Sequence, residues 1–234
     1  QRGGDHRTEH HRQAAGAEAL GVQGQGTVES LKEVDWFVPA VTEAVDDRPA
    51  SYDQGCSVDQ VSPVPILCEY GDPDGDVTIA MVGDSKIIQW QSALDAIAKE
   101  HGWHIYGYIK SACAFSTGIQ LAKGKPYTSC AEWNDRMLTT VTDLDPDLVL
   151  VSNRVNRALE DPDDPDSRTT QAMEDALAER WQQLANAGIP VLVLLDNPSP
   201  GMAVYECVAE HIEDPAACTF DRDEGTRSSA KPVQ

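Results

Sequence analysis

Between residues 77 and 195, short apolar runs alternate with segments whose apolar residues recur at helical spacing. The apolar runs predict strands at Val77–Val82, His104–Ile109, Asp147–Ser152 and Pro190–Leu195. The segments between them predict helices at Ile88–His101, Ala131–Leu144 and Arg168–Ala187, the last one ended by Gly188. Because each strand is apolar enough to be covered on both faces, the pattern predicts an α/β fold, a three-layer α/β/α sandwich around a mostly parallel sheet.

The two ends of the chain lack this pattern. Residues 1–50 are interpreted as a polar leader followed by an irregular wrapping segment, with a short helix at Ala14–Leu20. The α/β domain is expected at 51–225, followed by a polar tail at 226–234. The chain begins without Met and ends in this polar run, so we interpret it as a piece cut from a longer protein.

Charge narrows the range of partners. The chain has 18 Lys and Arg against 39 Asp and Glu, a formal net charge of -21 over 234 residues. Its field repels phosphate backbones and anionic lipid surfaces, which argues against a nucleic-acid partner. No apolar run approaches the ~20 residues that cross a bilayer.

The six cysteines form three close-spaced groups of two. They lack C-x-x-C spacing and the histidines are scattered, so no metal site is expected. Disulfides in an oxidising compartment are favoured over six buried thiols in a cytosolic protein, although the sequence leaves the connectivity open. Pairing of nearest neighbours would close three loops, each worth about 3 kcal/mol. These pairs are Cys56 with Cys68, Cys113 with Cys130, and Cys207 with Cys218.

The tripeptide Gly83-Asp84-Ser85 joins the first predicted strand to a helix. A serine at such a turn lies beside the free N–H groups of the helix N-terminus, which can stabilise an oxyanion, so Ser85 is a candidate nucleophile. The alternative is that Ser85 caps the helix and Asp84 is a turn residue. Three other polar pairs follow strands and belong to the edge where such sheets bind ligands. They are Lys110-Ser111, Ser152-Asn153 and Asp196-Asn197.

Several short motifs occur in order between Ala15 and Arg222. They are CEYGD at 68–72, GDS at 83–85, Gln89-Trp90, Ala93-Leu94, Gly102-Trp103, KSAC at 110–113, Cys130 with Trp133, PDLV at 146–149, and Cys207 through Cys218 to Asp221-Arg222. In this order they resemble the GDSL-like, or SGNH, esterases and acyltransferases. Within that family the resemblance is to the extracytoplasmic SGNH domain that follows an acyltransferase-3 membrane domain.

The resemblance implies a flavodoxin-like SGNH fold and a serine acyltransferase or esterase that forms an acyl-enzyme on Ser85. The N–H of Ser85, the turn around Ser111 and the amide of Asn153 would be the oxyanion donors, although Asn153 also suits a strand-end turn. No metal or organic cofactor is implied. The parent would carry an acyltransferase-3 membrane domain and move an acyl group, most often acetyl, onto a cell-surface glycan outside the cytoplasm.

Three departures from the family pattern stand out. Lys86 replaces the usual histidine after the serine, and Ala114 replaces a common proline. The Asp-x-x-His block that supplies the general base is not found. His211 is the one late histidine, but its acidic neighbours are in the reverse order, so we leave the base unassigned. Either the chain stops before that block or the domain is inactive. The alternatives to an enzyme are therefore a carbohydrate-binding or presenting domain and a purely structural domain.

Overall fold

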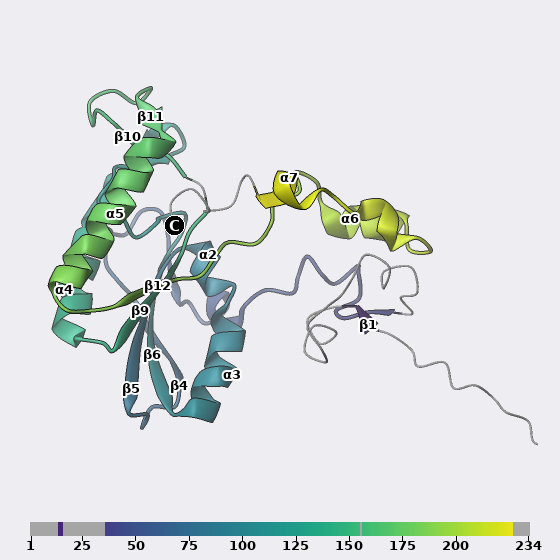
Figure 1. The fold of residues 1–234 in the computed structure, drawn as a ribbon, viewed down its shortest axis with the longest axis horizontal. Helices are drawn as coiled ribbons and strands as arrows, with labels where there is room; N and C mark the ends of the chain where they lie inside the picture. The colour runs from purple at the N-terminus through teal and green to yellow at the C-terminus, as the bar shows by residue number, and fades with distance from the viewer. Residues whose placement is uncertain (1–13, 16–35, 155, 227–234) are drawn as a thin grey trace, which may run out of the picture. The chain divides into compact units, whose positions relative to one another are not determined.

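The structure is a computed structural model that describes residues 14–15, 36–154 and 156–226 (Figure 1). The chain divides into two compact units. The larger unit contains residues 48–199 and 225–234, and the smaller contains residues 1–47 and 200–224. The domain boundaries predicted near residues 50 and 225 stay a prediction.

A six-stranded sheet forms the centre of the larger unit. Five strands run parallel in the order β12 (Val191–Val193), β9 (Leu148–Ser152), β5 (Val77–Gly83), β6 (Trp103–Lys110) and β3 (Ser57–Val58). The sixth, β4 (Leu67–Gly71), pairs antiparallel with β6 on the side that β3 also uses. The predicted mostly parallel sheet is therefore confirmed.

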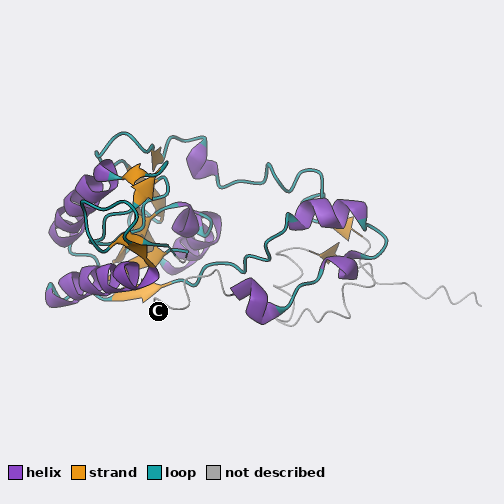
Figure 2. Ribbon diagram, turned by 90° about the horizontal axis from the view of Figure 1, so that it is seen from above, coloured by secondary structure: helices purple, strands orange, loops and turns teal. Residues whose placement is uncertain are grey.

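Helices cover both faces of this sheet, as the two views show (Figures 1 and 2). One face carries α2 (Ser85–Ile88) and α3 (Gln91–His101), and the other carries α4 (Thr128–Leu144) and α5 (Thr170–Asn186). Alternate residues of β5 enter the two cores: Ile79 and Met81 pack on the α2 and α3 side, and Ala80 and Val82 on the other. All four are buried, which explains the uninterrupted apolar run.

The helix predicted at Ile88–His101 is two helices in the structure. α2 ends at Ile88, and α3 begins at Gln91 after Trp90. The break lies where Gln89 turns its side chain toward Asp196 and Asn197 of the segment after β12. These partners are more than 100 residues away in sequence, so local periodicity gives no sign of the break.

Short elements complete the larger unit. Thr169 caps α5 by accepting the N–H of Ala172 at 3.0 Å. Gly102 ends α3 in the left-handed region with φ 66°, a conformation that glycine adopts without strain. The remaining elements are η2 (Ala50–Tyr52), the hairpin of β7 (Leu121–Ala122) and β8 (Lys125–Pro126), and the pair β10 (Ala158–Leu159) and β11 (Arg168–Thr169).

In the smaller unit, β1 (Ala14–Ala15) pairs in parallel with β2 (Trp36–Phe37). The predicted helix at 14–20 is thus wrong at its start, because Ala14 and Ala15 pair with a strand distant in sequence; residues 16–20 lie outside the described ranges. The later part of the unit contains α6 (Val204–Glu210) and η3 (Pro215–Cys218). The last helix, α7 (Arg222–Thr226), spans the boundary between the units in sequence.

All six cysteines form disulfides between nearest neighbours. The pairs are Cys56–Cys68, Cys113–Cys130 and Cys207–Cys218. This confirms the disulfide prediction and agrees with an extracytoplasmic location, because such bonds persist in oxidising compartments. In the part of the chain that the structure describes, no helix combines the length and apolarity of a membrane span.

Candidate functional site

Three chain segments leave the sheet together at its carboxyl edge, the edge where β5, β6 and β9 end. Gly83 on β5 lies opposite Ile109 on one side and opposite Ser152 on the other. Ser85 is two residues beyond that level, and so is Ser111 on the neighbouring strand. Since adjacent strands lie about 4.8 Å apart, the turns after the three strands form one continuous rim.

The turn before α2 presents Ser85 to solvent. Gly83 has φ 149°, and a Cβ there would lie 3.2 Å from Cγ2 of Ile87, so the position favours glycine. Asp84, not Ser85, is the N-cap: its carboxylate accepts the N–H of Lys86 at 2.9 Å. Ser85 is the first residue of α2 and is exposed. Its N–H has no hydrogen-bond partner among the described residues. This N–H belongs to the N-terminal end of α2, the end of a helix that attracts negative charge.

Ser111 is held by its backbone. Its N–H donates to the carbonyl of Val58 at 2.9 Å, and its own carbonyl accepts the Tyr127 hydroxyl at 2.8 Å. The side chain is partly exposed. Because the N–H is already used, only the hydroxyl of Ser111 remains as a donor to an oxyanion, and that role stays a prediction.

The segment that holds Ser111 is itself fixed by a buried lysine. Lys110 is fully buried, and its ammonium donates to the carbonyls of Asp59 at 2.6 Å and Ser62 at 2.7 Å. It also lies 5.2 Å from the centre of the Tyr127 ring. Burial lowers the pKa of Lys110, while the Asp59 charge opposes that change. The lysine therefore ties the end of β6 to the loop after β3.

Asn153 follows the last residue of β9 and is buried. Its amide nitrogen donates to the Arg154 carbonyl at 3.1 Å, while its oxygen has no partner. An amide nitrogen carries two hydrogens, so one remains for a further acceptor. The oxyanion role of Asn153 fits this geometry and stays a prediction.

The carboxyl group of Asp84 is buried directly beside Ser85. Burial raises its pKa from 3.8 to about 6. The hydrogen bond from the Lys86 N–H and the positive charge of Lys86 oppose this rise, as does Arg154, whereas the charge of Asp196 adds to it. The same carboxylate contributes to the raised pKa values of Tyr52 and Tyr127, in which burial is the largest cause. An ionisable group with a displaced pKa therefore lies at the base of the serine turn.

Lys86 extends across the edge to the segment after β12. Its ammonium lies 3.0 Å from a carboxylate oxygen of Asp196, whose side chain is 3% exposed. That oxygen also accepts the Asn197 N–H at 2.8 Å and lies 3.5 Å from the amide nitrogen of Gln89. Lys86 is thus a cation paired with a buried carboxylate, which suits it to hold α2 in place.

Ala114, the second departure, has a local explanation. Its N–H donates to Oε1 of Gln120 at 3.3 Å, and its carbonyl accepts the Gln120 amide at 3.1 Å. The same carbonyl accepts the amide of Asn134 at 3.0 Å. A proline at 114 has no N–H and could not make the first of these bonds.

No histidine forms a hydrogen bond with Ser85 within the ranges that the structure describes. His211 is the C-cap of α6 in the smaller unit and is exposed, so its role as the base stays a prediction. Among the described residues, no group of three His, Cys, Asp or Glu side chains is arranged to hold a metal ion.

Two features of this site were not predicted. They are the burial of Asp84 and the ion pair between Lys86 and Asp196. For Asp84, the sequence contained a signal for its role as the N-cap, where a short polar residue is preferred, but none for its burial. The Lys86–Asp196 pair joins residues on separate elements, and nothing in the local sequence connects them.

Comparisons with known proteins test the resemblance. A search of curated proteins gives no match. Among solved structures, the periplasmic domain of the lipopolysaccharide acetyltransferase of Salmonella ser. Paratyphi A matches with 14% identity and a TM-score of 0.46. That match covers 70% of this chain and 55% of the other chain. The family model described as the SGNH domain fused to AT3 domains matches residues 55–233. The chain therefore belongs to the family of SGNH domains that are fused to AT3 domains.

Proposed function

We propose that this domain is a serine-dependent O-acyltransferase or esterase that handles acyl groups, acetyl above all, of a cell-surface glycan. The observation that carries the proposal is the exposed Ser85 at the start of α2, with an unpaired N–H at the carboxyl edge of a parallel sheet. Membership of the SGNH family supports the same reading. A developing oxyanion would accept hydrogen bonds from Ser85 N–H, the Ser111 hydroxyl and the Asn153 amide.

The chemistry requires two steps. The hydroxyl oxygen of Ser85 attacks the carbonyl carbon of an acyl ester, its proton passes to a general base, and the alcohol of the donor leaves with that proton. A sugar hydroxyl, or water, then attacks the acyl carbonyl and gives its proton to the base, and that proton passes to the Ser85 oxygen as the acyl–serine bond breaks. The base stays unassigned, with His211 as the candidate that the sequence offers.

The family also indicates the partners and the cellular location of this domain. We propose that the parent chain contains an acyltransferase-3 membrane domain and that the acceptor is a glycan outside the cytoplasm. The match to a family of domains fused to AT3 domains supports the first, and the disulfides support the second. The net charge of -21 disfavours nucleic acid.

A fluorophosphonate probe on the full-length protein tests the proposal. We expect labelling at Ser85 and its loss in Ser85→Ala. Ser129→Ala is the matched control, because Ser129 is a partly exposed serine near the N-terminus of α4 in the same unit, and this variant should label normally. A folded full-length protein without labelling at Ser85 would count against an acyl-enzyme.

The second candidate is a catalytically inactive domain that binds or presents carbohydrate. It is favoured by one observation: no histidine is hydrogen-bonded to Ser85 in the described part of the chain. The two functions differ in one experiment. In the parent protein, Ser85→Ala abolishes glycan acylation if the serine carries the acyl group, and leaves acylation intact if the domain only presents the acceptor.

A further inference from the structure

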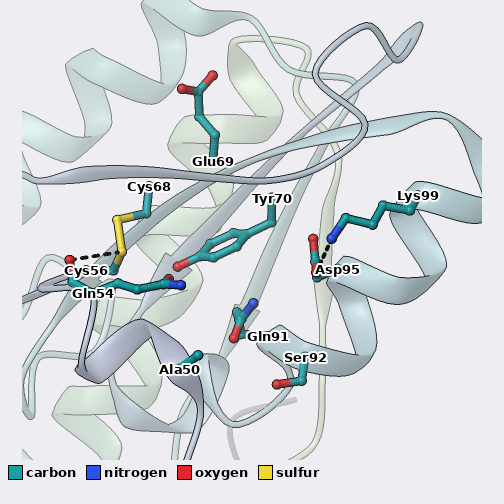
Figure 3. A pocket seen from close by; sticks show the side chains of 10 residues that line it. All are labelled: Ala50, Gln54, Cys56, Cys68, Glu69, Tyr70, Gln91, Ser92, Asp95 and Lys99. Carbon is teal, nitrogen blue, oxygen red and sulfur yellow. Dashed lines mark hydrogen bonds and ion pairs between the residues drawn. A yellow bond between two sulfur atoms is a disulfide. The ribbon is translucent and has the colours of Figure 1, made fainter.

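A polar pocket of about 590 Å³ lies beside α3, and Ser85 is not among the residues that line it. We call it the α3 pocket. Its ten lining residues come from the segment around η2, from β4 and from α3, and the Cys56–Cys68 disulfide forms part of the wall (Figure 3). All of them belong to the larger unit. A disulfide, a strand and a helix therefore fix its shape.

One wall of the α3 pocket contains an unsatisfied acceptor. Gln91, the first residue of α3, is 7% exposed, and its oxygen Oε1 is buried without a hydrogen-bond partner. Leaving such a group unpaired costs free energy, because it has lost water without gaining another partner. Since the side chain lines the pocket, a turn of its amide would bring this oxygen to a ligand that carries an O–H or N–H donor.

The charged groups on the Tyr70 side of the α3 pocket are balanced. Asp95 pairs with Lys99 at 2.7 Å and also accepts the N–H of Gly71 at 2.8 Å, so its carboxylate is already neutralised. Glu69 lies 2.9 Å from Nε2 of His104 and points to the opposite side of β4 from Tyr70 (Figure 3). On the Tyr70 side, the pocket thus offers no unpaired charge that would select an ion.

The remaining side chains of the α3 pocket suit a sugar ring. Tyr70 contributes an aromatic side chain whose hydroxyl is already bonded to Ser51 at 3.1 Å. Gln54 and Ser92 are exposed and line the same pocket, so an amide and a hydroxyl accompany the aromatic side chain. We propose that the α3 pocket binds a neutral sugar residue, whose hydroxyl groups donate to Gln91 and exchange hydrogen bonds with the other polar side chains.

This site does not depend on catalysis at Ser85. Its position nevertheless relates to the serine, because Gln91 is six residues further along the chain. Six residues span at most about 20 Å. A glycan chain held in the α3 pocket would therefore keep its neighbouring sugars close to the carboxyl edge. Only this link between the pocket and the carboxyl edge rests on the proposed function.

Nuclear magnetic resonance of the isotopically labelled chain tests the proposal. The probes are the neutral methyl glycosides of glucose, galactose, mannose and rhamnose, each raised to hundreds of millimolar, with methyl glucuronide as the anionic comparison. We expect at least one neutral glycoside to give saturable shifts at the Gln91 side-chain amide and at Ser92, with weaker binding of the glucuronide.

Gln91→Leu should abolish the saturable shifts while leaving the free energy of unfolding unchanged or raised, because the variant removes an unpaired buried oxygen. Gln182→Leu, at an exposed glutamine of α5, is the matched control and should bind as before. Gln54→Ala removes an exposed amide without touching the core and should weaken binding several-fold.

Several results would overturn the sugar site. They are the absence of saturable shifts with all four neutral glycosides, undiminished binding by Gln91→Leu, and tighter binding of the glucuronide. Ser85→Ala separates this site from the proposed catalysis. It should bind the glycoside normally whether or not Ser85 is labelled by a fluorophosphonate.

Discussion

Asp84 gives the sharpest quantitative prediction of the structure. Its pKa of about 6, against the ordinary value of 3.8, means that the folded chain holds this proton more tightly than the unfolded chain does. A rise of this size corresponds to about 3 kcal/mol at 1.36 kcal/mol for each pH unit. Because the folded state binds more protons between about pH 4 and pH 6, the contribution of Asp84 to stability is most favourable below this window and is lost as the pH rises through it.

Asp84→Asn removes the buried charge and keeps the cap, since asparagine is also a preferred N-cap. At pH 4, where Asp84 is mostly protonated in the folded chain, the variant and the natural chain should have similar free energies of unfolding. At pH 7.5 the variant should be more stable by about 3 kcal/mol. Urea unfolding of the disulfide-intact chain at both pH values measures this difference.

Asp59→Asn is the control with the opposite sign. The carboxylate of Asp59 accepts two backbone N–H groups at 2.8 Å, and these bonds hold its pKa below the ordinary value. Its contribution to stability is present at neutral pH and is lost as the pH falls, so this variant should lose stability at pH 7.5. The reasoning would be refuted if the free energies of unfolding of Asp84→Asn and the natural chain differed by the same amount at pH 4 and pH 7.5. It would also be refuted if Asp84→Asn were less stable than the natural chain at pH 7.5.

Three further changes test the interactions that hold the carboxyl edge of the sheet in place, and each is measured by urea or thermal unfolding. Lys110→Met should cost at least about 2 kcal/mol, because two buried carbonyls lose a charged donor; an unchanged midpoint would contradict this. Gly83→Ala should cost more than about 1 kcal/mol, since its φ of 149° and the 3.2 Å approach to Ile87 disfavour a Cβ. Removing both Cys113 and Cys130 should cost about 3 kcal/mol for the loop that they close, and reduction of the natural chain, which breaks all three disulfides, should cost more.

The larger unit was predictable because its core strands are buried on both faces. In β5 and β9 every position after the first two is buried, so apolar runs mark them clearly. The edge strand β4 was missed, because its residues are exposed or only half-buried and carry no such run. The two-residue strand β3 is too short to give any pattern.

The site was predictable only where it depends on a local turn. Gly83-Asp84-Ser85 indicated the serine because strand, turn and helix are contiguous. The assignment of Asp84 rather than Ser85 as the cap depends on backbone angles that the tripeptide leaves open. The Lys86–Asp196 pair and the α3 pocket depend on how β12, β4 and α3 assemble, so no spacing in the sequence indicates them.

The outer strands of the sheet affect how this domain behaves at high concentration. β4 exposes a free edge, and exposed apolar residues lie before it and at its start, with Val61 80% exposed and Leu67 44% exposed. Such an edge can recruit a strand from another molecule and begin aggregation. Pro63 and Pro65 interrupt this approach because they offer no N–H for pairing, and the Cys56–Cys68 bond holds the start of β4 against β3. Reducing conditions would release this strand, so self-association in a reductant should precede loss of the central sheet.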